Sequence, residues 1–133
     1  MKLPRRQFLR LTATAAAIPA VFRSAMAQAY PSRPVRLVVG YAAGGGTDIV
    51  ARLIGQSLSE RLSQQFVVEN RPGATTNIAT ELVVKAIPDG HTLLMATAAN
   101  AANATLYEKL NFNFMDDIAP VAGIMRVPNV IVS

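Results

Sequence analysis

The chain has 133 residues, no cysteine and a formal net charge of +5 at pH 7. Its length suits one domain or part of a larger one, and its hydrophobic content of 51% indicates a globular chain. Five of the 13 basic residues, and no acidic one, lie in the first 28 positions, so residues 29–133 carry no net charge. Without a surplus of clustered bases we expect no nucleic-acid partner. The lack of cysteine excludes disulfides, iron–sulfur clusters and thiolate metal sites.

Residues 1–27 have the three parts of an export signal. A basic stretch precedes a mostly apolar run at residues 11–22, and Ala25-Met26-Ala27 predicts cleavage before Gln28. The run is too short for a helix to cross about 30 Å of hydrocarbon, so we expect a processed protein that is not embedded in the membrane. Arg5-Arg6-Gln7-Phe8-Leu9 resembles the twin-arginine signal, and ordinary Sec export is the alternative. Either route predicts a periplasmic location in a Gram-negative cell.

The segment after the leader predicts an alternation of short apolar strands with helices. In chain order we expect a strand at 35–40, a helix at 48–62, a strand at 66–70, a helix around 78–86 and a strand at 92–97. Apolar residues of the first helix recur at helical spacing and predict one buried stripe, made of Ile49, Val50, Leu53, Ile54, Leu58 and Leu62. The second helix is expected to bury Ile78, Leu82, Val83 and Ala86. Beyond it we expect a loop at 98–104, a helical turn within 105–110, and strands at 121–125 and 130–132.

This order of elements predicts an α/β fold in which a Rossmann-like parallel sheet is flanked by helices. Ligands of such sheets bind beyond the carboxyl ends of the strands, where we expect the loops at 41–48, 70–77 and 97–103. Because the sequence stops in or just after an apolar strand, we expect a truncated chain.

The first of these loops contains Gly44-Gly45-Gly46-Thr47-Asp48, between the first strand and the first helix. Consecutive glycines can turn their N–H groups into an anion site, and a helix N-terminus adds partial positive charge. The alternative is a tight turn in which Thr47 or Asp48 caps the helix, and spacing does not separate the two. For Asp48 a cap or a loop brace is favoured over a ligand contact. The loop lacks the lysine of a phosphate-binding P-loop, and Ile49 stands where a dinucleotide fingerprint has its last glycine.

The other two loops carry small and polar side chains. In the second loop Arg71 is expected to pair with Glu69 or with a ligand carboxylate, and Asn77 to cap the following helix. The small residues of the third loop allow close approach of the backbone to a ligand, with an ordinary loop as the alternative.

Catalytic constellations are missing from the sequence. His91 is the only histidine and follows a Pro-Asp-Gly turn, so we expect it to be exposed. The acids Asp116 and Asp117 are neighbours whose side chains diverge, and no G-x-S-x-G elbow or metal-ligand spacing occurs. We therefore expect no enzyme, no cofactor and no metal site.

Several runs of this chain resemble the substrate-binding proteins of tripartite tricarboxylate transporters, known as Bug receptors. The matching runs are YPSRPVR at 30–36, VVGYAAGGGTD at 38–48, VENRPGA at 68–74, PDGHTLL at 88–94, NATLY at 103–107 and DIAPV at 117–121. The resemblance implies a two-domain fold of the type II periplasmic-binding-protein kind, of which residues 28–133 are an incomplete first lobe. It also implies a receptor that closes on a small organic carboxylate and delivers it to a membrane permease. Ligand binding is then expected at Gly44, Gly45, Gly46, Thr47, Asp48, Thr97, Ala98 and Asn100.

The chain departs from the family pattern in the second loop, where Thr75, Thr76 and Ala79 replace three glycines. At positions with positive φ, a β-branched residue costs about 1–2 kcal/mol. Because one lobe is missing, we expect residues 28–133 alone to bind solute weakly or not at all. Two rivals remain open: an enzyme that binds a phosphate or a nucleotide at the glycine loop, and an inactive remnant.

Overall fold

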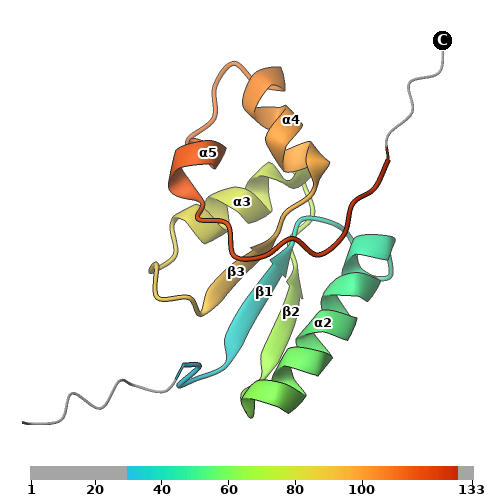
Figure 1. Ribbon diagram of the computed structural model, residues 1–133. Coiled ribbons are helices and arrows are strands. Elements are labelled where there is room, and N and C mark those ends of the chain that lie inside the picture. The colour runs from blue at the N-terminus through green and yellow to red at the C-terminus, as the bar shows by residue number, and fades with distance from the viewer. Residues whose placement is uncertain (1–29, 129–133) are drawn as a thin grey trace, which may run out of the picture.

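Three short segments rich in valine, leucine and other apolar residues pair as a parallel sheet. In the computed structural model, which describes residues 30–128, the strands are β1 (Val35–Val39), β2 (Phe66–Asn70) and β3 (Thr92–Met95). Their order is β2-β1-β3, with Val39 of β1 opposite both Asn70 and Met95 (Figure 1). The predicted α/β class with its parallel sheet is therefore confirmed.

The helical elements are α2 (Gly46–Leu62), the 3₁₀ turn η2 (Ala74–Thr76), α3 (Asn77–Val84), α4 (Ala98–Leu106) and α5 (Phe114–Asp117). From β1 the chain moves through α2 to one side, and from β2 it returns through α3 to the other side of β1. Right-handed crossovers in opposite directions put α2 and α3 on opposite faces of the sheet (Figure 1). The strand order therefore reverses between β1 and β3, which is where such sheets bind ligands.

The core is built on the central strand β1, which has a neighbour on each side. Its residues Val35, Val38 and Val39 are fully buried, and Leu37 is nearly so. The hydrophobic residues of the core outside β1 are Ala51, Phe66, Ala79 and Met95. Within residues 30–128, no helix combines the length and the apolar character that a membrane crossing requires.

The buried stripe predicted for the first helix is only partly right. Val50, Ile54 and Leu58 are half-buried, but Ile49 is 53% and Leu53 64% exposed, and Leu62 is also exposed. The fully buried positions of α2 that face the sheet side are the small residues Ala51 and Gly55. A Cβ at Gly55 would lie 3.2 Å from the Phe66 carbonyl oxygen, so close packing of the helix on β2 selects small residues there.

The second helix shows the same preference for small side chains. It ends at Val84, two residues before the predicted end, and Ile78 is 50% exposed. Its buried residues are instead Asn77, Ala79 and Thr80. The prediction that Ile78 lies on the buried face is therefore wrong.

The predictions after β3 need three corrections. Residues 98–104, expected as a loop, lie in α4, because five of these seven residues are alanines, the best helix formers. Residues 107–110 are not helical. Residues 121–125 are exposed and form no strand, because no strand among residues 30–128 pairs with them. The strand predicted at 130–132 and the leader at 1–27 lie outside the described residues.

Candidate functional site

The carboxyl edge of the sheet brings the three predicted loops into direct contact. Asn70, at the end of β2, donates from Nδ2 to the carbonyl oxygen of Tyr41, which follows β1, over 3.0 Å. The Tyr41 hydroxyl lies 3.0 Å from Oγ1 of Thr97, which follows β3. The backbone N–H of Arg71 donates to Val39 O at 2.8 Å. Loops distant in sequence are thus tied together at the carboxyl edge of the sheet, as predicted.

Asp48 braces the glycine loop from inside. Its side chain is almost fully buried, and Oδ2 accepts the Gly44 N–H at 2.8 Å and Arg52 Nε at 2.9 Å. Its other oxygen accepts Asn70 Nδ2 at 2.9 Å. These bonds, that from Arg52 foremost, then those from Gly44 and Asn70, lower the pKa of Asp48 from 3.8 to about 2. The carboxylate is therefore charged at every physiological pH and holds Gly44 at its positive φ of 86°.

The next amides of the loop are left open. Helix α2 begins at Gly46 with Gly45 as N-cap, and no side chain caps it, so capping by Thr47 or Asp48 is not observed. Ile49 N–H makes the first helical bond, to Gly45 O at 3.0 Å. Among residues 30–128, no acceptor bonds the N–H groups of Gly45, Gly46 or Thr47, and both glycines are exposed. Three unpaired amides at the positive end of a 17-residue helix form a site suited to an anion.

The second loop contains an unusual backbone stretch. Ala74, Thr75 and Thr76 have φ values of 44°, 50° and 75°, although none is glycine. Thr76 is buried, and its Oγ1 accepts Nδ2 of Asn100 at 2.9 Å. Nδ2 of Asn103 bonds Thr75 O at 2.6 Å. The two threonines that replace glycines of the family pattern therefore do adopt positive φ. Two buried amide side chains of α4 hold this stretch in place by hydrogen bonds.

Two side chains of this loop have internal partners. Arg71 forms an ion pair with Glu69, as predicted, with 2.5 Å between Nη2 and Oε1. Hydrogen bonds from Arg36 and then Arg71 keep the pKa of Glu69 below its usual value. Asn77 does not cap α3, because Thr76 holds the N-cap position and the Asn77 oxygen accepts Asn103 Nδ2 at 2.8 Å.

Most of the predicted third loop is helical, because α4 begins at Ala98. Thr97 is its N-cap, and Asn100 Oδ1 accepts the Thr97 N–H at 2.8 Å and the Thr97 hydroxyl at 3.1 Å. Asn100 also donates to Thr76 and Thr80, both at 2.9 Å, so its whole carboxamide has protein partners. Since the Thr97 hydroxyl donates to Asn100, the Tyr41 hydroxyl is the donor to Thr97. Ala98 is exposed at the first turn of the helix.

Of the eight predicted site residues, the structure brings all to one edge but gives them different environments. Gly45, Gly46 and Thr47 offer open amides, and Ala98 offers an exposed surface. Hydrogen bonds within the protein occupy the side chains of Asp48, Thr97 and Asn100. The backbone N–H of Gly44 is likewise bonded, to Asp48. Sequence reasoning missed Tyr41, Arg52 and Asn70 as parts of the site. The position of Asn70 at the carboxyl end of a predicted strand was the available signal.

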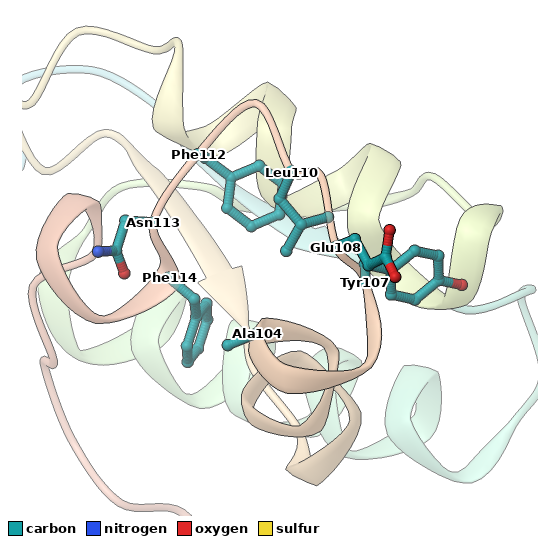
Figure 2. A pocket seen from close by; sticks show the side chains of 7 residues that line it. All are labelled: Ala104, Tyr107, Glu108, Leu110, Phe112, Asn113 and Phe114. Atoms are coloured by element: carbon teal, nitrogen blue, oxygen red, sulfur yellow. The ribbon is translucent and has the colours of Figure 1, made fainter.

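A separate hollow lies away from the glycine loop. It measures about 280 Å³ and is lined by the end of α4, the following loop and the start of α5, namely Ala104, Tyr107, Glu108, Leu110, Phe112, Asn113 and Phe114 (Figure 2). None of the eight predicted site residues lines it.

The prediction that His91 is exposed is wrong, because the residue is buried and only 7% exposed. Its ring packs edge-on against the Tyr30 ring, with 5.1 Å between the ring centroids. Its Nδ1 lies 3.0 Å from the Asp89 carbonyl oxygen. It precedes β3 and so lies at the amino edge of the sheet, the end opposite the site. Within the described residues, no three potential metal ligands cluster, around His91 or elsewhere.

Comparison with known proteins gives a consistent result. Residues 50–133 match the sequence profile described as tripartite tricarboxylate transporter family receptor. A UPF0065 protein of Bordetella bronchiseptica is 41% identical over 127 residues, 95% of this chain and 37% of that protein. Protein BugT of Bordetella pertussis is 35% identical over 109 residues, 80% of this chain and 33% of BugT.

Among solved structures, MatC from Rhodopseudomonas palustris with bound malate is 38% identical. The TM-score is 0.60, and the match covers 66% of this chain and 30% of MatC. The chain spans about a third of the length of the curated relatives it matches.

Proposed function

We propose a receptor function from one premise: the chain belongs to the tripartite tricarboxylate transporter receptor family. In this proposal, residues 28–133 form part of the first lobe of a two-domain receptor, which captures a small organic carboxylate and hands it to a membrane permease. The leader at residues 1–27 directs export, by the twin-arginine route, and cleavage after Ala27 leaves the protein in the periplasm. Its action is binding rather than catalysis.

The observation that carries the proposal is the row of open amides at Gly45, Gly46 and Thr47. A carboxylate that leaves water loses strong hydrogen bonds, and backbone N–H groups fixed by a helix replace them without reorganisation. Hydrogen bonds to charged groups contribute about 1.5–3 kcal/mol each. The malate in MatC, a relative with the same fold in the matched part, supports a small carboxylate as the ligand class.

The test is a titration of the ¹⁵N-labelled chain with malate, followed by amide resonances, because this method detects weak binding. We expect the N–H signals of Gly45, Gly46 and Thr47 to move, and those near His91, at the opposite edge, to stay. If malate, succinate and citrate at millimolar concentration move them neither in this chain nor in the chain completed with the missing lobe of a full-length relative, the proposal is refuted. A response to ATP or NAD instead would favour the rival, a phosphate- or nucleotide-binding enzyme.

A matched pair of variants isolates a single amide. Gly46→Pro removes one N–H at the first helical position, where proline fits the helix geometry and Gly45 is already extended. Gly46→Ala keeps the N–H, and its Cβ would meet no atom within 4 Å. We expect Gly46→Pro to weaken malate binding at least about tenfold and Gly46→Ala to leave it nearly unchanged. Equal affinities would show that this amide does not contact the carboxylate.

A further inference from the structure

We propose that Asn70 is a positioning residue that fixes the open amides of the glycine loop relative to the loop after β3. The inference rests on the proposed function for its effect on ligand affinity, but its structural part stands on the contacts of Asn70 alone. Asn70 is the last residue of β2 and lies opposite Val39 in the sheet. A rigid strand therefore places its side chain between the first loop and α2.

Every polar atom of the Asn70 side chain has a partner. Nδ2 donates to Tyr41 O at 3.0 Å and to Asp48 Oδ1 at 2.9 Å, while Oδ1 accepts Arg52 Nη2 at 3.2 Å. Asp48 in turn accepts a hydrogen bond from the Gly44 N–H. This bond fixes the turn of the loop that precedes the open amides. The carboxamide thus holds both ends of the glycine loop, at Tyr41 and at Asp48.

The same connection continues to the third loop. The Tyr41 hydroxyl bonds Thr97, and Thr97 is the N-cap of α4. One chain of hydrogen bonds therefore runs from Asp48 through Asn70 and Tyr41 to Thr97. Displacing Asn70 shifts the open amides against the start of α4, where the remaining predicted ligand contacts lie.

The chemistry of position 70 favours an amide over a carboxylate. Its Nδ2 faces two acceptors, the Asp48 carboxylate and the Tyr41 carbonyl, so an acceptor there would be repelled by both. Among the residues that the structure describes, the charged group on its other side is the Arg52 guanidinium, which Asp48 already neutralises. The neighbours in sequence, Glu69 and Arg71, are paired with each other.

Asn70→Asp tests this role with almost no change of shape. At about pH 7 the new carboxylate opposes Asp48, and we expect the amide resonances of Gly44 to Thr47 to move and malate affinity to fall about tenfold. Towards about pH 5 the paired acids share a proton, which restores a donor to Asp48, so resonances and affinity recover. The native chain should show no such recovery over this range.

Tyr41→Phe is the matched control, because it keeps the carbonyl that Asn70 bonds and removes only the hydroxyl bond to Thr97. We expect the Thr97 amide to move and those of Gly44 to Thr47 to stay. The inference is wrong if the Gly44 to Thr47 resonances of Asn70→Asp are the same as those of the native chain. It is also wrong if they differ from the native ones and do not recover at lower pH. If the resonances move and recover while the native chain binds no carboxylate, Asn70 positions the loop and the proposed function is the part that fails.

Discussion

Replacing Thr75 or Thr76 by glycine should change stability in opposite directions, although both residues have positive φ. Glycine removes a left-handed penalty of about 1–2 kcal/mol and adds about 0.4–1 kcal/mol of unfolded-state entropy. The Thr75 side chain is exposed, and within residues 30–128 its only bond is to the exposed Tyr107 hydroxyl at 3.2 Å. Little opposes the relief of strain, so Thr75→Gly should stabilise the chain by about 0.5–1 kcal/mol.

At Thr76 the contacts of the side chain make the expected change in stability unfavourable. Its Oγ1 accepts a buried donor of Asn100, and its Cβ lies so close to Gly40 that an added Cβ there would be 2.6 Å away. Removing the side chain leaves that donor unpaired, at about 1–3 kcal/mol, and loses the burial of a packed methyl, worth about 0.8 kcal/mol. Thr76→Gly should therefore destabilise by about 1–2 kcal/mol.

Urea unfolding of the two variants and the native chain, monitored by far-ultraviolet circular dichroism, measures both changes. Each variant is the other's control, since the chemical change is identical and the positions are adjacent. If both glycines stabilise the chain, the buried bond to Asn100 contributes nothing. If Thr75→Gly destabilises it by more than about 1 kcal/mol, the left-handed backbone is not strained.

Three further predictions concern a close contact, a carboxylate and a buried ring. Gly40→Ala should destabilise by about 1–3 kcal/mol, because its Cβ would meet Thr76, whereas Gly46→Ala should not destabilise; thermal unfolding compares them. Asp48, with its pKa lowered to about 2, contributes stability that is present above about pH 4 and lost as the pH falls towards 2; urea midpoints over this range should fall more steeply for the native chain than for Asp48→Asn, and parallel curves would contradict this. His91→Ala should cost about 2–3 kcal/mol by urea unfolding, and His91→Phe less than about 1 kcal/mol, because phenylalanine keeps the aromatic contact; equal losses would assign the effect to the Nδ1 bond.

The three strands of the sheet and their parallel pairing followed from the sequence because the strand signals are local. Residues 35–39 form an almost continuous apolar run, typical of a strand buried on both faces, and the alternation with helices left parallel pairing as the consistent topology. The carboxyl edge then gathers the three loops without any knowledge of side-chain contacts. This much of the candidate site is set by topology.

What sequence reasoning missed depends on distant partners. His91 is buried because Tyr30, sixty-one positions earlier, covers its ring. The exposure of Ile49 and Leu53 reflects which face of α2 meets β2, and the small residue Gly55 decides that. Helical spacing reports that a face is apolar, but it does not say which of two adjacent faces makes the closest contact.

A charged acid beside an anion site is the least expected feature of this loop, and the contacts of Asp48 explain it. Its charge is met by Arg52, by the Gly44 amide and by Asn70, and its own pKa falls, so its environment is more electropositive than water. The shift in its pKa comes first from the Arg52 guanidinium, and then from the Gly44 amide and Asn70, which all bond the carboxylate directly. Asp48 uses the one amide that precedes the cap and leaves the next three open. The acid therefore shapes the anion site from behind, and the Arg52 guanidinium balances its charge.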